Sequence, residues 1–339
     1  MDDSNNRNKE KLAELYPIVR EKRVLILAHD NPDPDALASA FALKYLLSAL
    51  WRISGTIAYG GIIGRAENKA MVKYLKIDLR PVSGIKMGSF GVIALIDSQP
   101  GSGNNSLPES VIPDVIIDHH MPVYEESLKA RFHDIRTNYG STSSILAGYL
   151  IASGLSSIDP RVATALFYGI RSDTRDLGRE TGPQDIAAYS HLYRYVPFKI
   201  LSRIEHPRLP RDYFRTFERA ISRALIDRDV VISDLEQIYS PDALSEIADL
   251  LIRVEGVQWA LCIGEFHGDI YFSLRTFHPK GHAGSVARKM VRELGSGGGH
   301  RMTAGGKITY ALNYQEMVRT VIDRFLKEIR RRDFKGERL

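Results

Sequence analysis

Residues 28–40 read AHDNPDPDALASA and directly follow the apolar run VLIL. Within seven positions the stretch places His29, Asp30, Asp33 and Asp35, interleaved with two prolines. The apolar run is typical of a strand that is covered on both faces, and the residues that follow have the spacing of a helix. One or two polar groups at such a junction would be explained by a surface turn. So many leave two interpretations, a turn or one wall of a metal site, and the rest of the sequence has to decide between them.

The composition is that of an ordinary globular protein that is large enough for two domains. The chain has 339 residues, of which 44% are hydrophobic and 26% are charged. No apolar run approaches the length that spans a bilayer, and the N-terminal sequence MDDSNNRNKEKLAEL lacks the apolar centre of a secretion signal. Cys262 is the only cysteine, which excludes an internal disulfide and a thiolate metal cluster. We therefore expect a cytoplasmic protein that does not bind membranes.

The charge of the chain is mildly basic. A net charge of +5 and a pI near 9.1 suit an anionic ligand such as a nucleotide without requiring one. Much of the excess lies in the C-terminal stretch LKEIRRRDFKGERL. We interpret this stretch as a solvated helix end rather than as a nucleic-acid-binding patch.

Short apolar runs alternate with helical spacing in the first half of the chain, which predicts an α/β domain. Continuous apolar strands separated by helices indicate a mostly parallel sheet that is covered on both faces. Ser141 or Thr142 is available as the N-cap of one helix. The expected strands span residues 23–28, 91–96 and 114–117, and the expected helices span residues 36–50, 141–152 and 161–170.

The second half predicts a smaller α/β domain that follows a linker. Residues 183–225 have mostly helical spacing but are broken by three prolines, which end helices. We therefore place a first domain at residues 15–190, a linker at 191–212 and the second domain at 213–335. The second domain is expected to contain strands at 230–233, 259–265, 269–275 and 307–310, helices at 284–294 and from about 314, and a glycine loop at 295–300.

Four clusters of carboxylates and imidazoles follow apolar elements, which is where open α/β sheets bind ligands. Each cluster alone has an ordinary explanation, such as a turn, a helix cap by Asp35, a strand end or a pair of core histidines. Together they would place several carboxylates at one rim of a sheet, where the charges repel unless a cation neutralises them. The clusters are His29-x-x-x-Asp33-x-Asp35, Asp97 in LIDSQP, Asp118-His119-His120 in DVIIDHHMP, and Asp173 in RSDT.

A metal site accounts for all four clusters at once. Carboxylate oxygens together with imidazole nitrogens suit Mn²⁺ or Mg²⁺ better than a metal that prefers thiolates. Four carboxylates and two histidines exceed what one divalent ion needs, so we expect two ions. Two ions about 3.5–4 Å apart suit the hydrolysis of phosphate esters. We expect Mn²⁺, with Mg²⁺ as the alternative.

The elements HDNPDPD, LID, DHH and RSDT, in this order over about residues 20–180, resemble the four motifs of the DHH phosphoesterase superfamily. The resemblance implies that Asp118 orients the metal ligands and that His120 lies near the scissile phosphate. A water between the metals would then attack phosphorus in line. We assign no catalytic role to Asp30. The implied ligands are His29, Asp33 and Asp97 for one Mn²⁺, and Asp35, Asp97, His119 and Asp173 for the second.

GSGGGHRMTAGG at residues 295–306 is the other distinctive stretch. Its composition is typical of a flexible hairpin loop, but bare backbone also lets an anion approach N–H groups closely. The stretch resembles the GGGH motif of the DHH-associated C-terminal domain, and YFSLRT resembles the S-x-R strand of that domain. The resemblance implies a substrate cleft between the two domains. The residues it assigns to nucleotide binding are Ser273, Arg275, Gly298, Gly299, His300 and Arg301.

Over about residues 20–330 the chain is most similar to the stand-alone nanoRNase group, also called oligoribonuclease and pAp phosphatase. These enzymes cut very short RNAs and linear dinucleotides to mononucleotides, and several remove the 3′-phosphate of 3′-phosphoadenosine 5′-phosphate (pAp). RecJ-like exonucleases, membrane-bound cyclic-dinucleotide phosphodiesterases and pyrophosphatases of the superfamily differ in their attached or second domains. The resemblance implies that an anchor in the second domain holds one end of the substrate and so limits its length.

Two alternatives stay open. A soluble phosphodiesterase for cyclic dinucleotides or their linear products would use the same site. A nucleotide sensor would keep the fold without turnover, although intact residues at all six ligand positions argue against it. The sequence leaves open the preferred base and length, the choice between Mn²⁺ and Mg²⁺, and the oligomeric state, for which a homodimer is one option.

Overall fold

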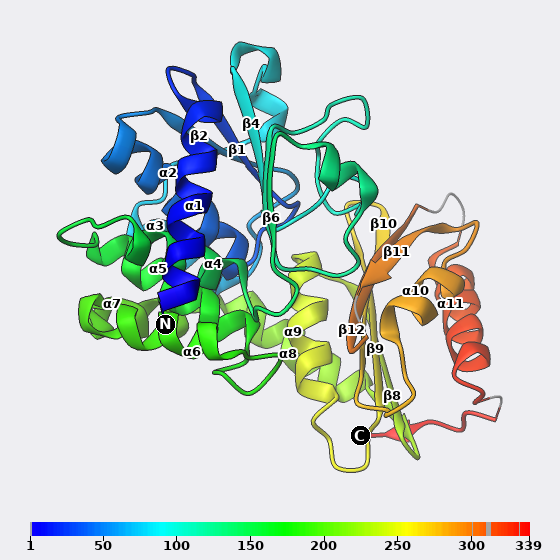
Figure 1. Ribbon diagram of the computed structural model, residues 1–339. Coiled ribbons are helices and arrows are strands. Elements are labelled where there is room, and N and C mark those ends of the chain that lie inside the picture. Colours follow the sequence, from blue (N-terminus) through cyan, green and yellow to red (C-terminus); the bar gives the residue numbers. More distant parts are fainter. Residues whose placement is uncertain (1, 300, 310–312, 332) are drawn as a thin grey trace. The chain divides into compact units, whose positions relative to one another are not determined.

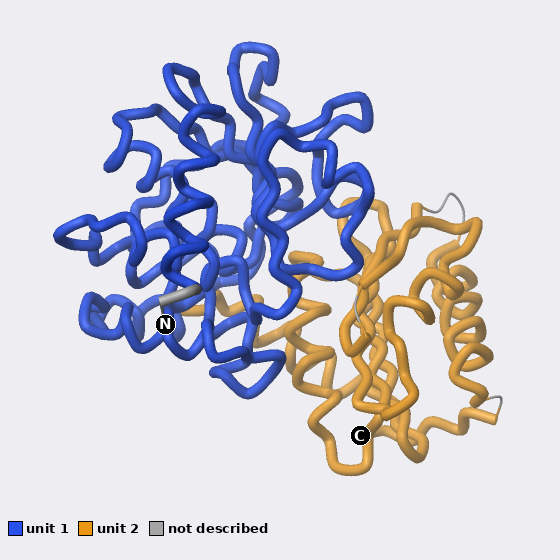
Figure 2. Tube along the Cα trace, viewed as in Figure 1, with its two compact units in different colours: residues 1–207 blue, residues 208–339 orange. Residues whose placement is uncertain are grey.

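The computed structural model shows two compact units (Figure 2). Unit 1 spans residues 1–207 and unit 2 spans residues 208–339. This boundary lies inside segment 191–212, for which we predicted a linker and which is largely helical. In the part of the chain that the structure describes, no helix is both long and apolar enough to cross a bilayer. The described residues are 2–299, 301–309, 313–331 and 333–339.

Unit 1 is built on a six-stranded sheet with the strand order β3-β2-β1-β4-β5-β6 (Figure 1). All neighbouring strands run parallel, which confirms the predicted type of sheet. Every residue of β1 is buried, as expected for a central strand covered on both faces. The strands are β1 (Val24–Ala28), β2 (Gly55–Tyr59), β3 (Leu79–Pro81), β4 (Val92–Ile96), β5 (Val115–Asp118) and β6 (Phe132–Ile135), of which β2, β3 and β6 are absent from our prediction.

The connections place a topological switch point between β1 and β4. From β1 the chain continues to β2 and β3 on one side, and it then returns to β4, β5 and β6 on the other. In the register between the two central strands, Ala28 at the end of β1 lies opposite Ile96 at the end of β4. Open parallel sheets bind ligands outside the carboxyl ends of their strands at such a point. His29 and Asp97 are the first residues after these two strands.

Local sequence explains how two helices of unit 1 begin. α2 (Pro34–Trp51) has proline at its first position, and the Asp33 carboxylate caps it by accepting a hydrogen bond from the Ala36 N–H. The cap is therefore Asp33 and not Asp35, the residue that the sequence suggested. α4 (Thr142–Ala152) is capped by Ser141, whose hydroxyl oxygen accepts a hydrogen bond from the Ser144 N–H.

The remaining helices of unit 1 complete its apolar core. α2 packs against α4 and α5, and α1 packs against α4. α5, which we expected to end at Ile170, continues to Asp173, so Asp173 lies in the last turn of the helix. These helices are α1 (Asp2–Val19), α3 (Ala66–Leu75), α5 (Pro160–Asp173), α6 (Pro183–Leu192) and α7 (Phe198–Glu205), with short 3₁₀ helices at 82–84, 87–89, 125–129 and 193–195.

Unit 2 contains a seven-stranded sheet with the order β11-β12-β10-β9-β8-β7-β13, which confirms a second domain built on a sheet. Its neighbouring strands are antiparallel except for β8 and β9, which are parallel. The strands are β7 (Leu225–Asp227), β8 (Val230–Gln237), β9 (Trp259–Phe266), β10 (Asp269–Thr276), β11 (Gly295–Gly299), β12 (Thr303–Thr309) and β13 (Glu337–Arg338). The helices are α8 (Arg211–Arg223), α9 (Pro241–Leu251), α10 (Ala283–Met290) and α11 (Tyr314–Glu328).

The glycine stretch differs from the predicted loop. Residues 295–299 form β11, which pairs with β12 in a regular antiparallel register. Glycine is needed there for close packing rather than for flexibility: a Cβ at Gly306 of β12 would overlap the Ser296 carbonyl oxygen and the Phe272 ring. The sequence therefore marked an unusual backbone correctly, but the prediction of a loop was wrong for these residues.

The C-terminal stretch also differs from the predicted solvated helix end. α11 ends at Glu328, and the chain then turns back so that Glu337 and Arg338 pair with β7. Arg331 Nη2 lies 2.7 Å from the Asp229 Oδ1 atom. Part of the basic charge of this stretch is therefore used to hold unit 2 together.

Candidate metal centre

The structure brings together the eight polar residues that the sequence singled out in unit 1. They belong to the loop after β1, the first turn of α2, the junctions after β4 and β5, and the last turn of α5. These segments are far apart in the sequence, and the switch point of the sheet is where they meet. The eight residues are His29, Asp33, Asp35, Asp97, Asp118, His119, His120 and Asp173.

Six of these side chains form two groups of possible metal ligands. In the first, His29 Nε2 lies 3.7 Å from Asp33 Oδ1 and 3.6 Å from Asp97 Oδ2. In the second, His119 Nε2 lies 3.0 Å from Asp173 Oδ2 and 3.9 Å from Asp35 Oδ2. Separations of this size leave each group able to close around one cation, since metal–ligand bonds to such atoms are about 2 Å long.

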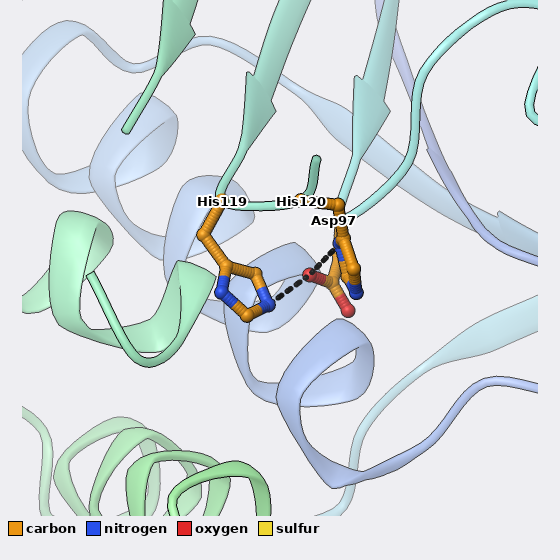
Figure 3. A group of neighbouring side chains, drawn as sticks. All are labelled: Asp97, His119 and His120. Atoms are coloured by element: carbon orange, nitrogen blue, oxygen red, sulfur yellow. Dashed lines mark ion pairs between the residues drawn. The ribbon is translucent and has the colours of Figure 1, made fainter. Parts of the chain in front are cut away.

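Asp97 belongs to both groups. Its Oδ2 atom faces His29, and its Oδ1 atom lies 3.7 Å from His119 Nε2. Figure 3 shows that the carboxylate lies beside both His119 and His120, and the Nδ1 atom of His120 is also 3.7 Å from Asp97 Oδ1. The φ angle of Asp97 is +58°, a left-handed value that costs a non-glycine residue about 1–3 kcal/mol. The structure holds this residue in an unfavourable backbone conformation at the point where the two groups meet.

The orientation of two imidazoles suits metal binding through Nε2. His29 Nδ1 lies 2.9 Å from the Asp30 carbonyl oxygen, and His119 Nδ1 lies 3.2 Å from the Tyr139 carbonyl oxygen. A carbonyl can only accept, so the proton is on Nδ1 and the Nε2 lone pair points toward the carboxylates. His119 Nε2 is buried and has no hydrogen-bond partner among the described residues. A buried nitrogen of this kind is the donor that a divalent cation requires.

The electrostatics of the cluster favour positive charge. Burial raises the pKa of Asp35 well above its usual value, and the charges of Asp97 and Asp173 add to the shift. Burial also raises the pKa of Asp97. For His29, burial opposes protonation, but the interaction with Asp33 and the charge of Asp97 outweigh it and raise the pKa to about 10. Carboxylates and imidazoles that retain protons so strongly have the charge and the donor atoms to bind divalent cations instead.

The N-terminus of α4 holds the carboxylates in place, which the sequence did not reveal. The backbone N–H groups of Thr142 and Ser143 each donate to Asp35, both at 2.7 Å. The Thr142 hydroxyl donates to Asp97 Oδ1 at 2.7 Å. The positive end of the helix dipole also favours carboxylates at this position. The only signal in the sequence was a helix start with the residues STSS, which we interpreted as a cap alone.

Arg179 is a second residue that the sequence analysis missed. It lies in a loop after α5 in which Arg175, Asp176, Leu177 and Glu180 all have positive φ angles. Its Nη2 atom donates to the Asp173 carbonyl oxygen at 2.7 Å, whereas its buried Nε atom has no hydrogen-bond partner among the described residues. Strained loops of this kind are frequent at functional sites. A guanidinium with an unused buried donor beside a metal ligand is suited to bind an anion.

Asp118 and Asp30 differ in their relation to the cluster. Asp118 is fully buried, and its Oδ1 atom lies 2.8 Å from His120 Nδ1, so it orients His120 directly. Asp30 instead accepts a hydrogen bond from the Ser106 hydroxyl at 2.7 Å. Asp30 is in none of the groups of possible metal ligands among the described residues.

In unit 2 the predicted substrate residues lie on neighbouring strands. Ser273 of β10 is opposite Gly305 of β12, which is in turn opposite Gly298 of β11. The Ser273 hydroxyl lies 2.9 Å from the Ser245 hydroxyl. Gly299 ends β11 with a φ angle of +143°.

The two predicted arginines of unit 2 have protein partners, and the histidine lies outside the described residues. Arg275 is largely buried and donates to Asp249 Oδ1 at 2.7 Å, so the structure records it in an ion pair. Arg301 Nη2 donates to the Pro279 carbonyl oxygen at 2.6 Å. His300 is not among the residues that the structure describes. The roles of these residues in nucleotide binding stay a prediction.

Two family models match the chain. The DHH family N-terminal domain model matches residues 23–170, and the DHHA1 domain model matches residues 227–328. The first range contains the strands of the parallel sheet, and the second contains most of the sheet of unit 2.

The relatives and one solved structure agree with these matches. An uncharacterised protein of Methanocaldococcus jannaschii is 36% identical over 94% of this chain, which spans 66% of that protein. A cyclic-di-AMP phosphodiesterase of Geobacillus thermodenitrificans is 22% identical over 86% of this chain and 45% of its own length. A probable manganese-dependent inorganic pyrophosphatase of Streptococcus agalactiae is 26% identical over 45% of this chain and 48% of its own length. The crystal structure of an exopolyphosphatase-related protein from Bacteroides fragilis superposes with a TM-score of 0.74 at 16% identity and covers 95% of this chain and 96% of that one.

Replacing the shared carboxylate should remove metal binding. We expect the wild-type chain to bind two Mn²⁺ ions, and we expect Asp97→Asn to lose most of this binding because the two oxygens of Asp97 face both ligand groups. Asp30→Asn is the matched control, since Asp30 lies in the same region but bonds to Ser106. Metal content after dialysis, measured by mass spectrometry, checks the expectation. An Asp97→Asn protein that retains both ions would contradict the shared role.

Metal affinity should increase with pH. The imidazole of His29 has a pKa of about 10, and the pKa values of Asp35 and Asp97 are raised, so these groups hold protons that a metal has to displace. Mn²⁺ affinity should therefore weaken from about pH 8 to about pH 6, with release of protons on binding. Calorimetry in buffers of different ionisation enthalpy measures this release. Binding without proton release would show that these groups are not the ligands.

Proposed function

Because this chain belongs to the DHH phosphoesterase superfamily, we propose that it hydrolyses very short RNA oligonucleotides and linear dinucleotides to mononucleotides. We include pAp as a further substrate, which would be converted to AMP. The observation that carries the proposal is the pair of ligand groups that share Asp97, since a site for two cations is suited to phosphoester hydrolysis. As the chain spans 66% of its first relative, these activities are proposed for the region described and not for a longer protein.

The donor set of each group fits one divalent cation. His29, Asp33 and Asp97 would hold the first, and Asp35, Asp97, His119 and Asp173 would hold the second. Divalent cations at such a site lower the pKa of bound water and neutralise charge on phosphoryl oxygens. Oxygen and imidazole donors are consistent with both Mn²⁺ and Mg²⁺, and the similarity to a manganese-dependent pyrophosphatase supports Mn²⁺.

Residues beside the ligand groups would bind the phosphoryl group and transfer protons. His120 is oriented by Asp118, so its Nδ1 atom is engaged and its Nε2 atom is the one that can give a proton to the leaving oxygen. Arg179 would donate from its unused Nε to a phosphoryl oxygen. The N-terminus of α4 would keep Asp35 and Asp97 fixed while the substrate binds.

Unit 2 supports the preference for short substrates. The Ser273–Gly305–Gly298 row places a hydroxyl and bare backbone side by side on three strands, an arrangement that lets a phosphate or a base approach closely. In the proposed function this surface holds one end of the substrate while the metal centre cuts. A fixed separation between anchor and metals would favour substrates of one or two linkages.

A cyclic-dinucleotide phosphodiesterase is the second candidate. The similarity to the cyclic-di-AMP phosphodiesterase of Geobacillus thermodenitrificans covers 86% of this chain and both of its units. The same metal centre would open a cyclic dinucleotide by the same hydrolysis, so only the fit of the substrate separates the two activities. A direct comparison of substrates is therefore required.

A substrate panel tests the proposal. With Mn²⁺, we expect turnover of pApA, pGpG and pAp to exceed that of longer RNA and cyclic dinucleotides, and a chelator should abolish it. His119→Ala should remove turnover because its Nε2 atom faces three carboxylates. His133→Ala, which changes an exposed histidine of β6, is the control and should stay active. Chromatography of the products measures the rates. Faster turnover of cyclic dinucleotides would favour the second candidate, and tight binding without any turnover would indicate a sensor.

The loop arginine should contribute to catalysis. We expect Arg179→Ala to lower kcat/KM by about 100-fold, the size of effect seen when one donor to a developing oxyanion is removed. Arg161→Ala at the other end of α5 is the control, because Arg161 pairs with Asp159 on the surface. Steady-state kinetics on the best dinucleotide measure both variants. Equal kcat/KM values in the Arg179→Ala variant and the wild type would exclude the role.

A further inference from the structure

Gln99 is a buried amide in the loop between β4 and β5, two residues after Asp97. Its residue surface is only 1% exposed. The Nε2 atom donates to Asp118 Oδ2 at 2.7 Å, and it also lies 3.2 Å from the His120 carbonyl oxygen and 3.3 Å from the Pro122 carbonyl oxygen. The amide nitrogen therefore faces only acceptors, all of them in or beside the Asp118–His119–His120 segment.

The other end of the same amide faces only donors. The Oε1 atom accepts from the Tyr124 N–H and from the Ser127 hydroxyl, both at 3.0 Å. The backbone carbonyl oxygen of Gln99 accepts from the Ser102 hydroxyl at 2.7 Å and from the Asn105 amide at 3.0 Å. Because donors and acceptors lie on opposite sides, only one orientation of the amide satisfies them. Neither a carboxylate nor an apolar side chain can reproduce this arrangement.

The hydrogen bonds continue from Gln99 through Asp118 to His120. The Asp118 carboxylate is fully buried, and it uses Oδ2 for Gln99 and Oδ1 for His120 Nδ1 at 2.8 Å. A buried carboxylate that loses one of its donors becomes costly and is free to rotate, since no water replaces the lost bond. The angle of the His120 ring therefore depends on a residue that does not touch it with its ring atoms.

We propose that Gln99 is a positioning residue that fixes the His120 ring by holding the Asp118 carboxylate. The inference rests on the proposed function in that His120 acts on the phosphoester. Gln99 touches neither group of metal ligands, because its side-chain bonds go to Asp118, to two carbonyls and to the Tyr124–Ser127 segment. Its contribution should therefore appear in the reaction step and not in metal binding.

Three variants separate positioning from general stability. Gln99→Met keeps the length of the side chain but removes both ends of the amide, and Gln99→Glu puts a carboxylate against Asp118 Oδ2. Asn105→Ala is the matched control: Asn105 bonds to Ser98, Ser102 and the Gln99 carbonyl in the same loop but has no bond to Asp118 or His120. We expect Gln99→Met to lower kcat about 10–100-fold with KM within about twofold and Mn²⁺ content unchanged. Asn105→Ala should keep the wild-type kcat.

A double-mutant cycle tests whether the effect passes through His120. If it does, Gln99→Met should lower kcat by less than about twofold further in a His120→Ala background, because the positioned ring is already absent. A full additional loss in that background would overturn the proposal, since it would show that Gln99 acts by another route.

Nuclear magnetic resonance of the histidines decides the inference without turnover. In the full chain labelled with ¹⁵N-histidine and loaded with Mg²⁺, Gln99→Met should shift the Nδ1–H signal of His120 or lose its protection from exchange. The signals of His29 and His119 should stay, because their Nδ1 atoms bond to backbone carbonyls that Gln99 does not contact. An unchanged His120 signal would overturn the proposal. A wild-type chain that cuts no member of the panel would end the proposed function alone, and the His120 signal would still test Gln99.

Discussion

The cost of burying the Asp97 carboxylate is the constraint on which the rest of the metal centre depends. Asp97 is 1% exposed, and it lies among three further carboxylates at the carboxyl edge of a parallel sheet. Charges of one sign are stable in such a place only if positive charge reaches them. The fold supplies part of it through the N–H groups at the start of α4 and through protonated imidazoles. Divalent cations would supply the remainder, which is why the same arrangement can bind metals.

The topology of the sheet explains how six ligands from distant segments meet. β1 and β4 are neighbours in space although α2, β2, α3 and β3 lie between them in the chain, and the crevice at their carboxyl ends opens where the two connections diverge. Each strand of this central region then needs only one or two polar residues after its last apolar position. The centre is rigid because helices α2, α4 and α5 begin or end in it and pack against one another in the core. Rigidity of this kind favours catalysis by positioning.

Residues around the ligands form a second layer that determines how the ligands point. Thr142 holds Asp97, Ser143 holds Asp35, and Gln99 holds Asp118. In unit 2 the corresponding device is a close-packed glycine sheet in which Gly298 and Gly305 lie beside Ser273. The two surfaces differ in chemistry, since one gathers charge and the other exposes backbone. Cutting and holding can therefore be assigned to different units of the chain.

The sequence alone determined the parallel sheet, the second sheet domain and the superfamily, because apolar periodicity and the four short motifs are local properties of the chain. It also brought His29, Asp33, Asp35, Asp97, His119 and Asp173 together as candidates, since residues at the carboxyl ends of parallel strands converge by geometry. Only the tertiary structure decided that Asp33 caps α2, that residues 295–299 are a strand, and that Thr142, Arg179 and Gln99 support the centre. Those facts rest on contacts between residues as much as 45 positions apart, as in the Thr142–Asp97 hydrogen bond, and no spacing in the sequence records which side chains such contacts will join.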